Sequence, residues 1–177
     1  NASFEEKTAM KIFSWNGAID TVMRPIDSIR HYKHFLRSGM MSMNPQTGHV
    51  KAWVGGINYK HFQFDHVFQG KRQIGSTFKP FVYASAIDQL KLSPCDSFPD
   101  GFYCVEARKF GAHEAWCPKN SGDRYTGKRT LKNALANSVN TISARIIDKV
   151  GPGPVSKLAT DLGVSSKIPS VPSIALG

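Results

Sequence analysis

The chain has 177 residues, of which 41% are hydrophobic and 20% are charged, a size and composition that fit one globular domain with its own core. No apolar run approaches the roughly 18 residues that span a bilayer, and no basic segment followed by an apolar one marks a signal peptide. The net charge of +10 comes from scattered lysines and arginines, which argues against a nucleic-acid partner.

The first 39 residues predict a short strand and a short helix. Residues 10–15 have strand character and are followed by a turn at Asn16-Gly17. A helix is then expected from Asp27 or Ser28 to about Arg37, with Gly39 as its stop. Its apolar face would comprise Ile29, Tyr32, Phe35 and Leu36.

A β-hairpin and a loop are expected next. Apolar residues alternate with polar ones on both sides of a proline-started turn over 44–48, and Gly55-Gly56 ends the second strand. Residues 57–72 show no clear period, so we expect a loop there. His61 and His66 in this loop match no metal-binding spacing, and we interpret them as surface histidines.

A serine and a lysine three residues apart open an apolar segment at residues 73–87. Pro80 is tolerated only in the first turn of a helix, so it places the helix start near Ser76. Residues three apart share a helix face, and the Lys79 amine can therefore reach the Ser76 hydroxyl. A lysine whose pKa is depressed by an apolar environment can act as the base that activates such a serine.

The next stretch, residues 92–127, is rich in proline, glycine and aromatic residues, which predicts loops with one hairpin at most. Its three cysteines allow three single disulfides with one thiol left over, and no C-x-x-C favours zinc. In an exported protein we expect Cys104 to pair with Cys117, leaving Cys95 free. The alternative is three unpaired thiols.

Two helices with a polar break between them are predicted at residues 131–151. Thr130 is a suitable N-cap for the first helix, and Gly151-Pro152 would end the second. The polar residues 137–140 interrupt the apolar pattern and would project Ser138 and Asn140 from a short loop. A last short helix is expected over 155–162, ended by a glycine and followed by a turn-rich connection.

Four segments together resemble the transpeptidase domain of class A penicillin-binding proteins. Residues 72–83 resemble the segment that carries the active serine, and residues 43–56 resemble the opening hairpin of that domain. Residues 116–120 fit the family's W-x-P-x-N segment. Residues 131–151 place S-x-N about sixty residues after S-x-x-K, where the family has its second motif.

The resemblance implies a role for each of four residues. Ser76 would be the nucleophile that attacks the penultimate D-alanine of a peptidoglycan stem peptide, and Lys79 would accept its proton. Ser138 would relay a proton to the departing D-alanine, and Asn140 would hold the substrate amide and steady Lys79. β-Lactams would acylate the same serine. No metal or organic cofactor is implied.

The same resemblance implies a fold, a domain layout and a location. The fold would be α+β, a penicillin-binding protein/serine β-lactamase-like transpeptidase fold with helices packed on an antiparallel sheet, incomplete at the C-terminus. Residues 1–39 would lead in from an upstream glycosyltransferase domain, and 40–177 would be the N-terminal part of the transpeptidase domain. We expect the whole protein to be anchored in the cytoplasmic membrane, facing the periplasm or cell exterior, with other cell-wall synthesis proteins as further partners.

The family's third motif, K-T-G or K-S-G, does not occur after Ser138. That strand supplies one oxyanion-hole N–H group, whose loss typically costs about 100- to 1,000-fold in rate, so the chain alone is expected to be a weak or inactive enzyme. A serine β-lactamase and a β-lactam sensor are the alternative functions. The E-x-x-x-N motif of class A β-lactamases is not found.

Overall fold

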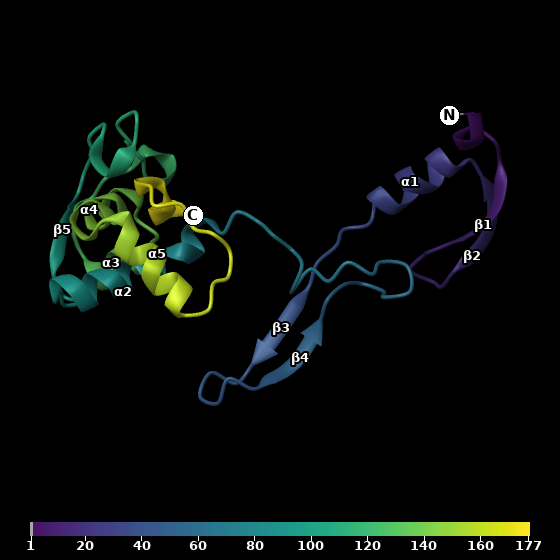
Figure 1. Cartoon of the computed structure of the whole chain (residues 1–177), viewed down its shortest axis with the longest axis horizontal. Helices are drawn as coiled ribbons and strands as arrows, with labels where there is room; N and C mark the ends of the chain where they lie inside the picture. The colour runs from purple at the N-terminus through teal and green to yellow at the C-terminus, as the bar shows by residue number, and fades with distance from the viewer. Residues whose placement is uncertain (1) are drawn as a thin grey trace. The chain divides into compact units, whose positions relative to one another are not determined.

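The computed structural model describes residues 2–177, and the chain divides into two compact units with the boundary after Arg72 (Figure 1). The first unit contains a short 3₁₀ helix and five further elements: η1 (Ala2–Phe4), β1 (Thr8–Ile12), β2 (Ile19–Met23), α1 (Pro25–Lys33), β3 (Met40–Met43) and β4 (Val50–Val54). Within residues 2–177, none of the helices has the length and apolar character needed to cross a membrane.

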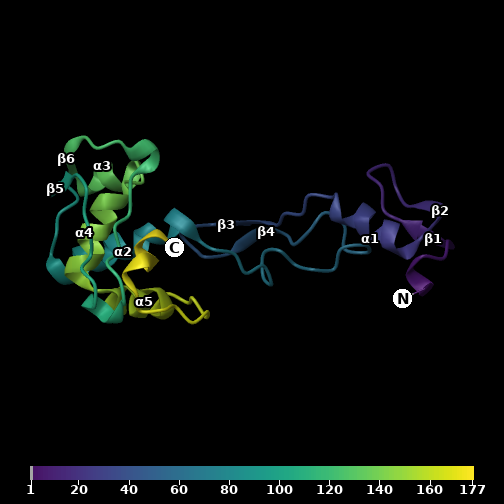
Figure 2. The ribbon, with the colours of Figure 1, turned by 90° about the horizontal axis from the view of Figure 1, so that it is seen from above.

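The strand expected near residues 10–15 is β1, which pairs with β2 in an antiparallel hairpin (Figure 2). Its turn is closed by reciprocal backbone hydrogen bonds of 3.1 Å between Ser14 and Gly17, and the Ser14 hydroxyl donates to the Gly17 carbonyl at 2.6 Å. The left-handed backbone of Gly17 suits this turn, because glycine adopts a positive φ without steric cost.

The expected helix begins and ends at earlier residues than the sequence indicated. Helix α1 begins at Pro25, because proline suits the first turn, and it ends at Lys33. Phe35 lies beyond the helix and packs edge-on against Phe13 and His31, with ring centroids 5.0 Å apart in both pairs. Leu36, predicted on the apolar face, is 89% exposed, so that part of the helix prediction is wrong.

The second hairpin is confirmed. β3 and β4 pair antiparallel with a register shift near Met43, and the Asn44 side chain accepts the backbone N–H groups of Gln46 and Thr47 in the turn. Residues 57–72 contain no helix or strand, as expected. Asp65 organises this loop by accepting the backbone N–H groups of Val67 and Phe68.

The second unit is mainly helical. Its elements are η2 (Gly75–Phe78), α2 (Lys79–Leu90), β5 (Ser97–Asp100), η3 (Lys109–Gly111), η4 (Ser121–Asp123), β6 (Gly127–Thr130), α3 (Leu131–Ala136), α4 (Asn140–Val150), α5 (Pro152–Asp161) and η5 (Pro172–Leu176). Helices α2 and α4 pack together through a buried apolar cluster that includes Val82, Ala86, Ile142 and Ile146.

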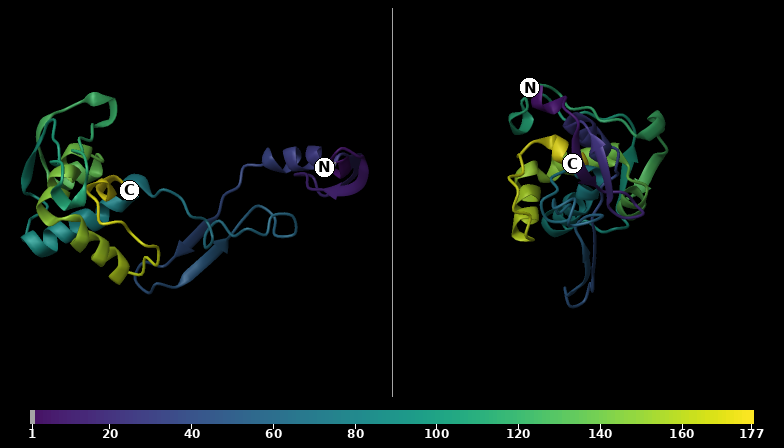
Figure 3. Two further views of the ribbon diagram at one scale, coloured as in Figure 1. Left: turned by 45° about the horizontal axis from the view of Figure 1, so that its top comes forward. Right: turned by 90° about the vertical axis from the view of Figure 1, so that its right-hand side faces the viewer.

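The C-terminal residues also complete this core. Ile174 and Ala175 of η5 are buried. η5, the yellow turn in Figure 1 and Figure 3, packs against α4. The sequence suggested only a turn-rich connection here. Helix α5 was expected from residue 155 but begins at Pro152, because two prolines fit its first turn.

Residues 92–127 are mostly loop, as predicted, and the strand pair that involves them is long-range and not a local hairpin. β5 pairs antiparallel with β6, with Ser97 opposite Thr130 and Asp100 opposite Gly127. Between them the chain forms loops, two 3₁₀ turns and a single bridge of Val105 with Trp116. Pairing partners this far apart cannot be recognised from local turn residues.

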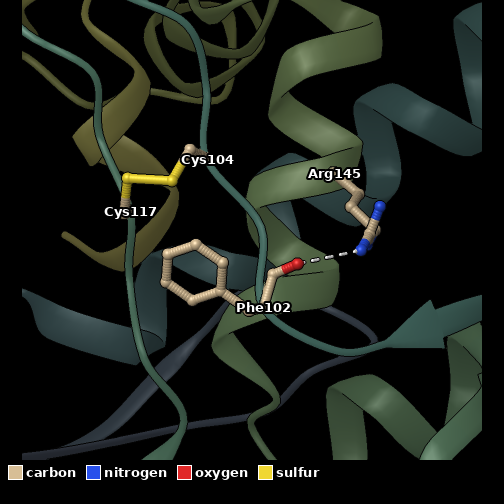
Figure 4. Close-up of a disulfide and its surroundings, with 4 residues drawn as sticks. All are labelled: Phe102, Cys104, Cys117 and Arg145. Atoms are coloured by element: carbon tan, nitrogen blue, oxygen red, sulfur yellow. Dashed lines mark hydrogen bonds between the residues drawn. A yellow bond between two sulfur atoms is a disulfide. The ribbon is translucent and has the colours of Figure 1, made fainter.

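The expected disulfide joins Cys104 and Cys117 (Figure 4), and Cys95 is free and exposed. The loop that it closes is fastened to α4. The Tyr103 hydroxyl donates to Asp148 at 2.7 Å, the Lys109 amine lies 2.7 Å from the same carboxylate, and the Arg145 guanidinium stacks 4.1 Å from the Tyr103 ring centroid.

Replacing both Cys104 and Cys117 by alanine is expected to lower the free energy of unfolding by about 3 kcal/mol, because opening a loop of this length frees the unfolded chain. Chemical denaturation of the chain measures this loss. Cys95→Ala is the matched control and should leave the unfolding midpoint unchanged. Equal stability of the double variant and the parent would contradict the prediction.

Candidate active site

Ser76 lies in the 3₁₀ turn η2, directly before α2. The turn is entered through Gly75 at φ +59°, and the backbone N–H of Lys79 donates to the Ser76 carbonyl where the turn passes into α2. Pro80 occupies the first turn of α2, so the predicted helix start is confirmed. The Ser76 side chain is exposed, which leaves its hydroxyl open to a ligand.

Lys79 is buried, with only 1% of its surface exposed. Its amine donates three hydrogen bonds, to the Ser138 carbonyl at 2.7 Å, the Ser138 hydroxyl at 3.0 Å and the Asn140 side-chain oxygen at 2.7 Å. An ammonium group has three donors, so these three acceptors satisfy it fully. Two segments almost sixty residues apart in sequence are joined at this amine.

The expected contact between Lys79 and Ser76 is not among the hydrogen bonds of the described residues. The three acceptors from Ser138 and Asn140 take all the donors of the amine instead. Ser76 nevertheless lines the same cavity as Ser138 and Asn140. The structure therefore brings the four predicted residues to one place, with Lys79 bound to the second motif and Ser76 beside it.

The predicted break between two helices is confirmed. Helix α3 begins after Thr130, whose hydroxyl accepts the Asn133 N–H at 3.2 Å, and it ends at Ala136. Ser138 has a left-handed backbone with φ +53°, which turns the chain sharply between α3 and α4. The second helix resumes earlier than expected, so Asn140 is the first residue of α4 instead of a loop residue.

Burial lowers the pKa of the Lys79 amine to about 8. The charged form loses hydration in this position, and only the neutral form can accept a proton from a serine hydroxyl. At pH 7 a base with this pKa is neutral in about a tenth of the molecules. The site can thus supply a neutral amine near physiological pH.

A cavity of about 510 Å³ lies over these residues. Besides the two serines and Asn140, its walls include Asn120 and the guanidinium-bearing residues Arg124 and Arg129. Hydroxyl, amide and guanidinium groups can bind the carbonyl and carboxylate groups of a peptide-like ligand. In residues 2–177, no three His, Cys, Asp or Glu side chains gather as metal ligands.

Asp100 and Asn120 support the site, and the sequence did not single out either for a role. Asp100 is 3% exposed and accepts five hydrogen bonds from side chains and backbone, including one from Asn120 at 2.6 Å. The residues Pro99-Asp100-Gly101 are typical of a surface turn, so the local sequence gives no sign that the Asp100 carboxylate is buried. Asn120 is the last residue of the W-x-P-x-N segment, and that motif is the only sequence signal that points to it.

Comparisons with known proteins give matches over most of the chain. Residues 1–36 match the penicillin-binding protein middle domain, and residues 39–173 match the penicillin binding protein transpeptidase domain. Penicillin-binding protein 1A of Neisseria flavescens is 38% identical over 144 residues, and the match covers 80% of this chain and 18% of that protein. Penicillin-binding protein 1A of Vibrio cholerae is 35% identical over 141 residues, with 79% and 17% covered.

Two solved structures extend the comparison. Penicillin-binding protein 1A from Haemophilus influenzae superposes with a TM-score of 0.72 at 30% identity, covering 80% of this chain and 21% of that chain. The PonA1 protein from Mycobacterium tuberculosis, solved with penicillin V, gives a TM-score of 0.64 at 22% identity, covering 86% and 43%. These likenesses confirm the fold class expected from the sequence. The chain spans less than a fifth of the length of the curated relatives above.

Proposed function

Because this chain belongs to the penicillin-binding protein transpeptidase domain family, we propose that it carries the acylation centre of a serine-type peptidoglycan D,D-transpeptidase. The observation that carries the proposal is the buried Lys79 amine. This amine has a lowered pKa and donates hydrogen bonds to Ser138 and Asn140, which line the same cavity as the exposed Ser76.

In this proposal Ser76 attacks the carbonyl carbon of the penultimate D-alanine of a stem peptide while Lys79 takes the hydroxyl proton. The C–N bond then breaks, and the terminal D-alanine leaves with a proton relayed through Ser138. Asn140 binds the substrate amide and holds the lysine amine. The amine of a neighbouring stem peptide accepts the acyl group, which cross-links the wall and frees Ser76.

A β-lactam would be attacked by the same route. Its strained ring amide resembles the D-Ala-D-Ala amide, so Ser76 would open the ring and remain acylated. No metal or cofactor enters this chemistry. The chain alone would turn over weakly or not at all, because the second oxyanion donor of a K-T-G strand does not follow Ser138 in this sequence.

The alternatives share the acylation step and differ afterwards. A serine β-lactamase must deacylate quickly, and the sequence has no E-x-x-x-N to activate water. A β-lactam sensor would stay acylated and signal. The likeness to proteins named Penicillin-binding protein 1A favours the transpeptidase over both.

The wider setting of the chain is also a proposal. We assign residues 1–39 to a lead-in from an upstream glycosyltransferase domain and residues 40–177 to the transpeptidase domain. The whole protein would be anchored in the cytoplasmic membrane, with this region facing the periplasm or cell exterior. Its ligands there would be stem peptides and β-lactams, and other cell-wall synthesis proteins would be its neighbours.

Intact mass after incubation with benzylpenicillin tests the acylation centre. We expect the chain to gain the mass of one benzylpenicillin, and Ser76→Ala to gain none, since the nucleophile is removed. Ser166→Ala, an exposed serine outside the cavity, is the matched control and should be acylated like the parent. The measurement is made on the 177-residue chain and on the intact natural protein.

Each outcome has a definite meaning. An adduct that depends on Ser76 in the 177-residue chain places the nucleophile and its base within these residues. An adduct only in the intact protein means that a further oxyanion donor is required. Failure of the intact, folded protein to be acylated at Ser76 would refute the proposed function.

A further inference from the structure

A single buried carboxylate, that of Asp100, connects three segments beneath the cavity. One oxygen accepts the Asn120 side-chain amide at 2.6 Å and the Thr141 hydroxyl at 2.9 Å. The other accepts the backbone N–H and hydroxyl of Thr126 at 3.1 and 2.8 Å, and the Arg129 side chain at 3.3 Å. A carboxylate that receives this many donors is held ionised and rigid.

This carboxylate fixes which way the Asn120 amide points. The Asn120 nitrogen donates to Asp100 and to the Arg124 carbonyl at 3.0 Å, so its oxygen must face the opposite side. That oxygen accepts the backbone N–H groups of Asn140 at 2.9 Å and Thr141 at 3.2 Å. These are the first two N–H groups of α4, which have no acceptor within the helix.

Asn120 thus caps α4 from a distant segment. Val139, at the N-cap position, has no side chain that could do so. The Asn140 side chain is held from both ends, because its nitrogen donates to the Lys119 carbonyl at 2.7 Å and its oxygen accepts the Lys79 amine. Thr141, next along α4, is tied directly to Asp100.

We propose that Asp100 is a positioning residue for acylation. It acts through Asn120 and Thr141 to fix the first turn of α4, and so holds the Asn140 amide against the Lys79 amine. This role rests on the proposed function of Ser76 and Lys79. The competing account is that the buried Asp100 forms an ion pair with the partly exposed Arg129 that contributes only to stability.

Asp100→Ala in the intact natural protein separates the two accounts. We expect the rate constant for acylation of Ser76 by benzylpenicillin to fall about 100-fold, because small misplacement of a reacting group has effects of this size. The dissociation constant of the initial complex should change little. Rates are measured on the folded protein, below the unfolding transition of each variant, by stopped-flow with benzylpenicillin. Asp88→Ala, an exposed aspartate of α2, is the control and should match the parent.

A double-mutant cycle provides the second readout. Asn120→Ala should slow acylation to a similar extent, and the Asp100→Ala/Asn120→Ala double variant should lose little more than either alone, because both act on the same amide. Two independent structural roles would instead give losses that multiply. If Asp100→Ala does not fold, Asp100→Asn, which keeps the size and one acceptor, replaces it in the cycle.

The pH profile of acylation is the third readout. Loosening the first turn of α4 would let water reach the Lys79 amine, so the acidic limb of the profile should move to higher pH in Asp100→Ala. The charged groups around the cavity besides Lys79 are Asp100, Arg124 and Arg129. A folded Asp100→Ala variant that is acylated at the parental rate would overturn the proposal. The proposal would also fail if the rate losses of Asp100→Ala and Asn120→Ala multiplied while the acidic limb stayed at its parental pH. A parent protein that is never acylated at Ser76 would point instead to failure of the proposed function.

Discussion

Replacing Lys79 by methionine is expected to slow acylation of Ser76 by benzylpenicillin about 100- to 10,000-fold. A positioned general base contributes rate factors of this size. Methionine has a similar length and suits a buried site, so the loss comes from the missing amine and not from a cavity. The second-order rate constant of acylation, measured in the intact protein by stopped-flow, gives the ratio directly.

Lys149→Met is the matched control, since Lys149 is an exposed lysine in the last turn of α4. It should acylate at the parental rate. If Lys79→Met also kept the parental rate while remaining folded, Lys79 would not be the base, and the proton would have to pass to another group at the cavity.

The lowered pKa of Lys79 gives this reaction a defined pH dependence. Burial brings the pKa to about 8, so the neutral amine dominates above pH 8 and declines about tenfold with each unit below it. Acylation should therefore rise with pH between about 6 and 8 and level off above. The acidic limb should be lost in Lys79→Met. A parental profile that is flat over this range would contradict the role of a neutral amine.

The same titration affects stability with a definite sign. A lysine whose pKa is lower in the folded than in the unfolded state binds fewer protons when folded. Stability then rises with pH between about 8 and the ordinary lysine value of 10.5, and the full cost of burying the charge is present below pH 8. In the proposed function this cost accompanies a lysine amine that acts in its uncharged form.

The sequence predicted those parts of the site that depend on local patterns. Ser76 and Lys79 were singled out by a three-residue spacing and a proline, which are local features of the start of one helix. The break that contains Ser138 and Asn140 was predicted because polar residues interrupt an apolar helical pattern, whereas their place in the site came only from the resemblance to a family. The meeting of Lys79 with these residues is a tertiary contact, and it was anticipated only through the resemblance to a family.

The support beneath the site was missed for a physical reason. Asp100 binds residues 20 to 41 positions away in sequence, and its neighbours predict only a turn. The pairing of β5 with β6 was missed for the same reason, because no short turn connects these strands. The early end of α1 depends on Phe35 packing against Phe13, a contact that helix propensity cannot predict.

Ile146→Ala is expected to lower the free energy of unfolding by about 3 kcal/mol, within the range of 2 to 5 kcal/mol typical of buried isoleucine truncations. Ile146 is fully buried on α4, in the same cluster as Val82 and Ala86 of α2. The smaller side chain loses apolar burial and leaves a cavity between the two helices that carry Lys79 and Asn140. Urea denaturation of the chain measures the change.

Two further variants show whether packing is the cause. Ile146→Val removes one methylene group and should cost only about 0.5 to 1.5 kcal/mol, whereas Lys149→Ala on the exposed side of α4 should cost less still. Acylation of the folded fraction of Ile146→Ala should persist, because Lys79 and Asn140 keep their hydrogen bond at the other end of α4. If Ile146→Ala lost no more stability than Lys149→Ala, packing between α2 and α4 would not be what stabilises the two helices that carry Lys79 and Asn140.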